Sequence, residues 1–166
     1  MELSKSTASR LYDPVRRLWV KRTQEEEVRN ALVIKMVEEL GYPLSGLSVE
    51  KELVKLPHLQ LVPRKLIPNR RADIISFAKD IHPHFPLYPL LMIECKKGEV
   101  TVAHLRQVVG YNQSVKAHFL CVAGAYQMVT GSYNREKELF EFVPGLPSFI
   151  QLLQALKSFS IQASPK

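Results

Sequence analysis

The sequence contains few cysteines and no long apolar run. Cys95 and Cys121 are the only two cysteines, and both lie in apolar segments. This scarcity excludes a disulfide framework and a cysteine-rich zinc site, and it favours free, buried thiols in a reducing compartment. No apolar run reaches the about 18 residues of a membrane span, and the N-terminus lacks the apolar stretch of a signal peptide. We therefore predict a soluble intracellular protein, most simply cytoplasmic, without membrane contact.

A phosphate-binding loop is also absent. No Gly-x-x-x-x-Gly-Lys-Ser/Thr segment occurs, so this chain carries no ATP-driven motor of that kind. Acidic residues are the minority charge, because 23 Lys and Arg outnumber 16 Asp and Glu and give a formal net charge of +7. Such an excess favours contact with a polyanion such as nucleic acid, although it carries no information on specificity.

The length of 166 residues, 46% of them hydrophobic, suits one globular domain. The expected organisation is an N-terminal arm or short helix over residues 1–22, a domain over residues 23–159 and a tail over residues 160–166.

The first long helix is predicted over residues 24–40. Thr23 and Glu26 form a capping-box pattern at its start, and Gly41 and Pro43 follow its end. On a helical wheel Glu25 lies near the centre of the apolar stripe and Glu26 at its edge, while Arg29 can pair with Glu25 one turn later. A carboxylate that faces a core needs a partner, which makes Glu25 and Glu26 candidate site residues. The alternative is that they only stabilise the positive end of the helix dipole.

A second acidic position lies within a predicted strand over residues 70–78. Asp73 is one of only three aspartates in the chain, and aspartate is disfavoured in strands. A Pro-rich connection over residues 79–89 then leads to a buried strand that ends in Glu94-Cys95-Lys96. The connection predicts adjacent antiparallel strands that bring Asp73 near Glu94. Strand alternation directs Glu94 and Lys96 to one side and Cys95 to the other. By itself, a Glu-x-Lys tripeptide also fits a chance ion pair.

The other elements complete an α/β pattern. A strand is expected over residues 47–56, and a helix capped by Thr101 over residues 102–116, with Gln107 and Tyr111 four residues apart on one face. The apolar segment 118–123 suits a central strand covered on both sides. Two edge strands over residues 126–130 and 138–143 and a last amphipathic helix over residues 148–159 follow.

Taken together, these motifs resemble the PD-(D/E)xK nuclease superfamily. Ala72-Asp73, Glu94-Cys95-Lys96 and the helical Gln107-x-x-x-Tyr111 carry that resemblance. More narrowly, the chain resembles the nuclease-like N-terminal domain of the R subunit of type I restriction enzymes, and stand-alone proteins built on that domain. The similar stretches lie between about residues 21 and 125: 23–29, 39–43, 49–51, 71–74, 91–96 and 107–112. Lys97-Gly98 and Ala123-Gly124-Ala125 depart from the pattern of these relatives.

The resemblance implies a restriction-endonuclease-like core, with a mixed central sheet of four or five strands flanked by helices. It implies metal-dependent phosphodiester hydrolysis, with Asp73, Glu94 and the backbone carbonyl of Cys95 as ligands of Mg²⁺ or Mn²⁺. Lys96 would act beside the metal, and Glu25 or Glu26 would complete the site. The residues that would support the site or contact the substrate are Gln107, Tyr111, Arg29 and Arg71. The expected substrate is nucleic acid, most simply DNA.

Two other interpretations remain at this stage. The domain could be a nucleic-acid-binding or assembly module that keeps the fold but acts only with a partner subunit, or the Glu-x-Lys could be a chance feature of a basic α/β protein. Loss of Asp73, Glu94 or Lys96 would have favoured the binding module, and all three are present. The sequence leaves open whether the substrate is DNA or RNA and whether the protein forms a homodimer.

Overall fold

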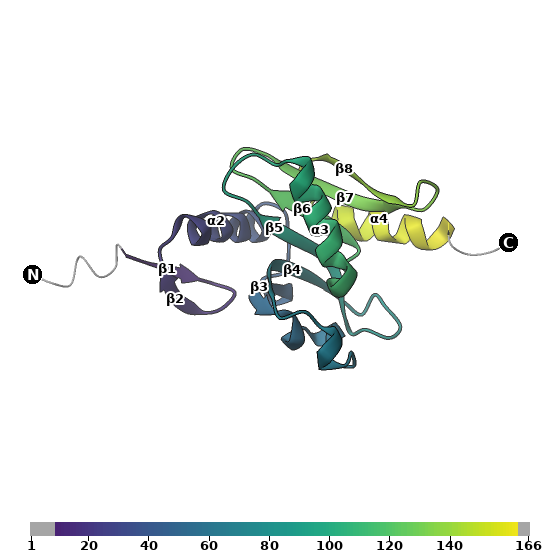
Figure 1. The fold of residues 1–166 in the computed structure, drawn as a ribbon, viewed down its shortest axis with the longest axis horizontal. Coiled ribbons are helices and arrows are strands. Elements are labelled where there is room, and N and C mark those ends of the chain that lie inside the picture. The colour runs from purple at the N-terminus through teal and green to yellow at the C-terminus, as the bar shows by residue number, and fades with distance from the viewer. Residues whose placement is uncertain (1–8, 163–166) are drawn as a thin grey trace, which may run out of the picture.

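The computed structural model describes residues 9–162, and side chains are described for residues 9–158. The described chain forms a mixed six-stranded sheet in the order β3-β4-β5-β6-β7-β8, with helices on both faces and a separate two-stranded hairpin beside it (Figure 1). The strands are β1 (Arg10–Asp13), β2 (Leu18–Lys21), β3 (Leu47–Glu52), β4 (Arg71–Lys79), β5 (Leu87–Cys95), β6 (Phe119–Ala123), β7 (Met128–Asn134) and β8 (Leu139–Pro144). The helices are α2 (Gln24–Glu38), α3 (Val102–Val115) and α4 (Phe149–Gln162).

The centre of the sheet is the most buried part of the molecule. Strand β5 pairs antiparallel with β4 and parallel with β6, and Leu90 to Ile93 are fully buried. One face packs against α2 and α4, through residues such as Met36 and Leu152, and the other packs against α3 through Val108 and Val115. Coverage on both faces explains the nearly continuous apolar runs of β5 and β6. The predicted central position of the 118–123 segment is confirmed.

Local signals set the helix ends. The Thr23 hydroxyl accepts a hydrogen bond from the Glu26 amide at 3.2 Å, which confirms the predicted N-cap of α2. After α2, Gly41 adopts φ +70° and the Tyr42 amide donates to the Met36 carbonyl at 2.9 Å, which closes the helix. Thr101 caps α3 by the same kind of contact with His104.

The sheet is larger than the predicted four or five strands. The β7–β8 hairpin continues the sheet, because β7 pairs with β6 along its length, from Phe119 opposite Ser132 to Ala123 opposite Met128. The strand predicted over residues 47–56 ends at Glu52, because the chain turns there and buries Leu53 and Leu56 in short 3₁₀ helical turns.

The two ends of the chain differ from their predicted forms. Residues 10–21 form the β1–β2 hairpin and not a short helix, while residues 1–8 of the predicted arm lie outside the described residues. Helix α4 extends to Gln162, so the predicted tail begins inside the helix, and residues 163–166 lie outside the described residues. No described helix is long and apolar enough to cross a membrane.

Candidate functional site

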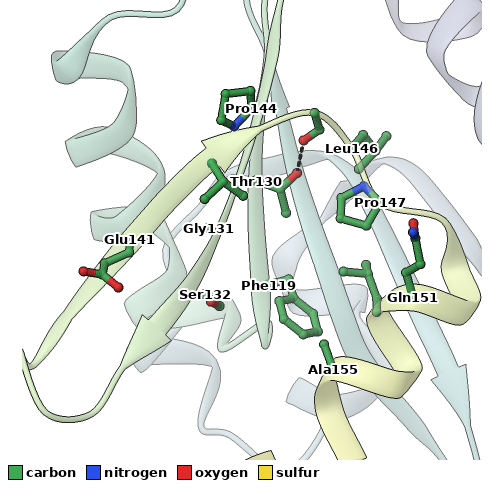
Figure 2. Close-up of a pocket in the computed structure, with 13 residues that line it drawn as sticks. Phe119, Thr130, Gly131, Ser132, Glu141, Pro144, Leu146, Pro147, Gln151 and Ala155 are labelled. Carbon is green, nitrogen blue, oxygen red and sulfur yellow. Dashed lines mark hydrogen bonds between the residues drawn. The ribbon is translucent and has the colours of Figure 1, made fainter. Parts of the chain in front are cut away.

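Two cavities differ in the chemistry that their lining residues offer. The cavity in Figure 2 lies between β7, β8 and α4, where the Thr130 hydroxyl donates a hydrogen bond to the Gly145 carbonyl at 2.7 Å. Glu141 is the only titratable side chain among its lining residues, so this cavity offers no acid–base pair. A second cavity, of about 370 Å³, gathers charged groups and is the candidate site. Its lining residues are Glu25, Val28, Arg29, Glu50, Asp73, Glu94, Cys95, Lys96 and Lys97.

Three carboxylates of this site come from three neighbouring strands. Ile74 of β4 lies opposite Ile93 of β5, so the next positions, Asp73 and Glu94, face each other across the antiparallel pair. On the other side of β4 the register pairs on both sides leave Glu50 of β3 beside Asp73. The predicted proximity of Asp73 and Glu94 is thus confirmed, and Glu50 is an acidic residue that sequence reasoning missed.

Glu50 has an unusual backbone conformation. Its φ is +49°, in the left-handed region that non-glycine residues rarely adopt, and the ladder between β3 and β4 skips this position. A strained residue of this kind costs about 1–3 kcal/mol and often marks a functional site. Here the irregularity directs the Glu50 carboxylate to the cavity that Asp73 also lines. The sequence Ser48-Val49-Glu50-Lys51 by itself does not indicate this backbone conformation.

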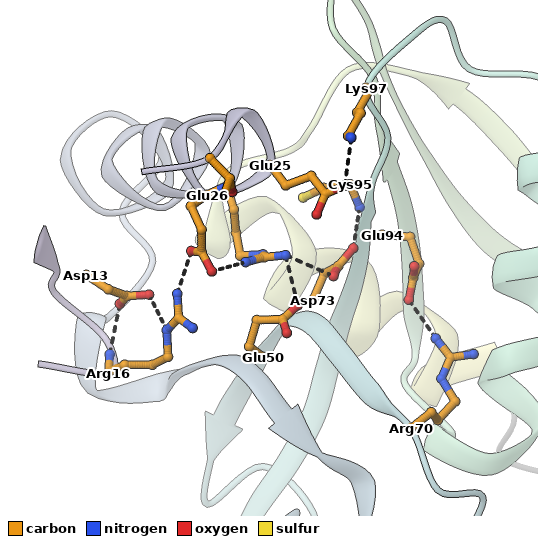
Figure 3. Close-up of polar contacts among 12 residues, drawn as sticks. Asp13, Arg16, Glu25, Glu26, Glu50, Arg70, Asp73, Glu94, Cys95 and Lys97 are labelled. Atoms are coloured by element: carbon orange, nitrogen blue, oxygen red, sulfur yellow. Dashed lines mark hydrogen bonds and ion pairs between the residues drawn. The ribbon is translucent and has the colours of Figure 1, made fainter. Parts of the chain in front are cut away.

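Arg29 is the buried cation at the centre of this group. Its guanidinium contacts Glu50 at 2.8 Å, Glu26 at 3.1 Å and Asp73 at 3.4 Å, and only 8% of its side chain is exposed (Figure 3). The Glu26 carboxylate also forms an ion pair with Arg16 at 2.5 Å, and Arg16 forms a second ion pair with Asp13 at 2.6 Å. A chain of ion pairs therefore connects the turn of the β1–β2 hairpin, the start of α2 and the middle of the sheet.

The predicted roles of Glu25 and Glu26 are altered by this arrangement. Glu25 is 60% exposed at the mouth of the cavity, where it pairs with Lys97 at 3.0 Å, which lowers the pKa of Glu25. The expected core-facing Glu25 and its pair with Arg29 are wrong, since Glu26 makes the pair with Arg29. The helical wheel gave the wrong direction for Glu25 because the first turn of α2 lies beyond the edge of the apolar core, which begins at Leu32.

The Asp73 carboxylate is held from two directions. Oδ1 faces Arg29, and Oδ2 accepts a hydrogen bond from the Cys95 amide at 2.8 Å. Through this second bond Asp73 fixes the end of β5, directly before Lys96. The Cys95 side chain packs with the core cluster on the α2 side. Burial and the nearby Asp73 charge raise the pKa of its thiol, which therefore stays protonated.

Glu94 and Lys96 both reach the α3 side, as strand alternation predicted. Glu94 pairs with Arg70 at 3.0 Å, and the Arg70 guanidinium carbon lies 3.0 Å from the centroid of the Tyr111 ring. Tyr111 accepts a hydrogen bond from the Gln107 amide at 2.6 Å, and Gln107 accepts one from the Lys96 ammonium at 2.7 Å. These five residues form a connected network in which α3 positions the two charged groups at the end of β5.

Arg71, which the resemblance assigned to the site, makes a different contact. It pairs with Glu52 at 3.7 Å, more than half of its side chain is exposed, and it is not among the residues that line the site cavity. Its neighbour Arg70 contacts Glu94 instead. Arg70 precedes β4, so it does not follow the alternation of the strand that was predicted to begin at residue 70.

The burial of several carboxylates in one place shifts their titration. Burial is the main cause that raises the pKa of Glu94 to about 7, and the Asp73 charge adds to it. Burial also raises the pKa of Glu50, against the opposing effect of Arg29. In both residues the loss of solvent around the carboxylate outweighs the attraction of the nearby cations.

The raised pKa of Glu94 predicts how stability depends on pH. In the folded state Glu94 keeps its proton up to about pH 7, above the ordinary glutamate value. Its contribution to stability is therefore fully present below about pH 4.5 and is lost as pH rises through about 7. The titration of Glu94 changes the free energy of unfolding by up to about 3 kcal/mol. Urea unfolding of the parent chain and of Glu94→Gln at acidic and basic pH measures the effect. We expect the variant to lose much of this slope, and equal slopes would contradict the assignment.

The donor set suits a hard divalent cation. Asp73, Glu94 and Glu50 offer carboxylate oxygens, and Cys95 offers a backbone carbonyl at the end of the strand. As they stand, however, Asp73 turns to Arg29 and Glu94 to Arg70, and no group of three or more acidic, histidine or cysteine side chains within the described residues is arranged to hold a metal. A cation at this site therefore competes with Arg29 for Asp73 and Glu50.

Comparison with known proteins gives one finding. The family model described as type I restriction enzyme R protein N terminus (HSDR_N) matches residues 24–147, which is more than half of the chain. The matched part begins at α2 and contains all the residues that line the candidate cavity. No curated protein and no solved structure matches the chain significantly.

Proposed function

The chain belongs to the family of the type I restriction enzyme R protein N terminus, and from this membership we propose that it hydrolyses phosphodiester bonds of nucleic acid with the help of a divalent cation. The biological setting that fits the family is a restriction system acting on DNA, in which further subunits take part.

One observation carries the proposal. Asp73 and Glu94 face each other on neighbouring strands, and Lys96 follows Glu94 by two residues at the rim of the same cavity. The raised pKa of Glu94 supports it, since burial disfavours the ionised carboxylate and a bound cation would stabilise that ionised form. The network from Lys96 to Gln107 supports it further, because it holds the ammonium at the cavity mouth.

In this proposal Asp73, Glu94 and the Cys95 carbonyl hold Mg²⁺ or Mn²⁺, with Glu50 as a further donor. When bound, the ion neutralises phosphate oxygens and lowers the pKa of an attacking water. Lys96 supplies a compact positive charge to the phosphate as negative charge builds on it.

Four residues would act by positioning the others. Gln107 orients Lys96, and Glu26 draws Arg29 toward the start of α2. Tyr111 holds Arg70, which orients Glu94. Glu25 lies at the cavity mouth, where its pair with Lys97 borders the path by which a substrate enters.

A cleavage assay tests the proposal. Duplex, single-stranded and branched DNAs and an RNA are incubated with the parent chain in Mg²⁺ or Mn²⁺, and in EDTA. We expect cleavage of at least one substrate that requires the cation and is lost in Asp73→Asn, a variant purified in parallel. Cleavage that persists in EDTA or in Asp73→Asn would show that this site does not carry the activity.

The position of Arg29 favours a second candidate function. Because its guanidinium already neutralises Asp73 and Glu50, the domain could bind nucleic acid without cutting it, or cut only after a partner subunit moves Arg29. For such a module we expect nucleic-acid affinity that is equal in the parent and in Asp73→Asn and insensitive to Mg²⁺. A change in affinity on adding Mg²⁺ that depends on Asp73 would favour the nuclease.

A further inference from the structure

The β1–β2 hairpin presents one face that the core does not use. Tyr12 lies opposite Trp19 and Arg10 opposite Lys21, and residues opposite each other in an antiparallel pair share a face. The hairpin face is therefore composed of two aromatic and two cationic side chains, Arg10, Tyr12, Trp19 and Lys21. All four are exposed, with Trp19 58% and Tyr12 44% accessible.

This composition is unfavourable for the hairpin itself. Like charges directly opposite each other repel, and within the described residues neither Arg10 nor Lys21 has an ion-pair partner. The two rings are tilted against each other, with centroids 5.5 Å apart and planes at 59°, and both keep a large exposed surface for a flat ligand. Arg17, in the turn of the hairpin, adds another exposed positive charge.

The hairpin is held in a defined place relative to the candidate site. Arg16, in its turn, bonds to Asp13 within the hairpin and to Glu26 of α2, and Glu26 contacts Arg29 in the site (Figure 3). A groove of about 520 Å³ begins at Val15 and Leu18 of the hairpin and runs along β3. Leu18 lies on the face of the hairpin opposite to that of Tyr12 and Trp19, because successive strand residues alternate between faces. Glu50 lines both this groove and the site cavity, so the groove connects the turn of the hairpin, and not its aromatic face, with the site.

We propose that the hairpin face binds unpaired nucleotides of the nucleic-acid substrate, with bases stacked on Trp19 and Tyr12 and phosphates beside Arg10 and Lys21. This inference rests on the proposed function and names single-stranded segments as a part of the substrate that the protein binds outside the candidate site. Aromatic rings bind bases of any sequence through their π-faces, and basic residues beside them follow the phosphate backbone. Stacking of neighbouring base pairs covers those π-faces in duplex, so duplex should bind this face more weakly.

Trp19 is the only tryptophan of the chain and reports on this face directly. Oligothymidylate is titrated into the full-length protein in EDTA, and tryptophan fluorescence is recorded together with the anisotropy of the labelled oligonucleotide. We expect the single strand to quench Trp19 and a duplex of equal length to quench it much less. Tyr12→Ala and Trp19→Ala should weaken single-strand binding about tenfold or more by anisotropy.

Matched controls separate this face from general surface effects. Tyr126→Ala removes another aromatic side chain, 92% exposed, and should leave the affinity unchanged. Arg10→Ala should reduce the slope of log affinity against log salt by about one phosphate contact, whereas Lys79→Ala, at the end of β4 far from Asp73, should not. Because Tyr12, Trp19 and Arg10 are exposed, their variants should melt at the temperature of the parent, which calorimetry verifies.

Several outcomes would overturn the inference. If the oligonucleotide binds while Trp19 fluorescence and all variants stay unchanged, the hairpin is not a contact, and cation-dependent cleavage would still support the proposed function. Equal quenching by duplex would remove the preference for unpaired bases. Sedimentation that shows a dimer broken by Trp19→Ala would assign the face to a second copy of the chain. Absence of any nucleic-acid binding would overturn both this inference and the proposed function.

Discussion

Lys96→Ala is expected to slow cation-dependent cleavage about 100- to 1000-fold, the usual effect of removing one preorganised charge from a reaction centre. The Lys96 ammonium is held by Gln107 at 2.7 Å, at the rim of the cavity that Asp73 and Glu94 line. Its charge matters most when negative charge builds on the phosphate. The loss should therefore appear in the single-turnover rate and much less in substrate affinity.

A charge-matched variant serves as the control for Lys96. Lys79→Ala also removes one positive charge, but at the end of β4 that is far from Asp73. This variant should cleave at the parent rate. Gln107→Ala, which frees Lys96 without removing it, should give a smaller loss than Lys96→Ala. The proposed role of Lys96 would be refuted by a Lys96→Ala rate equal to that of the parent, or by a loss confined to substrate affinity.

Arg29→Met is expected to destabilise the fold by about 3–5 kcal/mol near pH 8, the typical effect of removing one partner from a buried ion pair. The substitution keeps an unbranched side chain but leaves Asp73, Glu50 and Glu26 without their shared cation. At about pH 5 the loss should be smaller, because Glu50 and Glu94 have raised pKa values and become protonated first. Urea unfolding at the two pH values measures both effects.

The same variant also tests the competition between Arg29 and a metal ion. If Arg29 occupies part of the cation site, Mn²⁺ should restore more stability to Arg29→Met than to the parent. Arg22→Met is the control, since Arg22 pairs with Glu27 at the surface of the same helix start and should cost about 1 kcal/mol or less. Equal losses of unfolding free energy in Arg29→Met and Arg22→Met would mean that Arg29 is not the cation that stabilises Asp73, Glu50 and Glu26.

Much of the fold followed from sequence patterns. The buried runs at residues 90–93 and 118–123 predicted the centre of the sheet, and the Pro-rich connection between Asp73 and Glu94 predicted their antiparallel strands. The extent of the sheet did not follow, because strand pairing between β6 and β7 depends on register and not on local periodicity. The hairpin at residues 10–21 was missed because four-residue strands carry too little pattern to separate them from a helix.

The candidate site was predicted only in part, for a related reason. Asp73 and Glu94 lie on strands and Lys96 directly follows β5, so alternation gives their direction, and all three line one cavity. Glu50 and Arg70 were missed: Glu50 reaches the site through a left-handed backbone conformation, and Arg70 reaches it from a loop. Glu25 and Glu26 exchanged their expected roles, because the first turn of α2 lies beyond the core that the helical wheel assumes.

The central claim is that the carboxylates around Asp73 form a site for a divalent cation. Calorimetric titration of Mn²⁺ into the parent chain and into Asp73→Asn, at a pH above 7 so that Glu94 is ionised, tests it most directly. We expect one binding site for Mn²⁺ in the parent and none in the variant. No binding to the parent, or equal binding to both proteins, would contradict it.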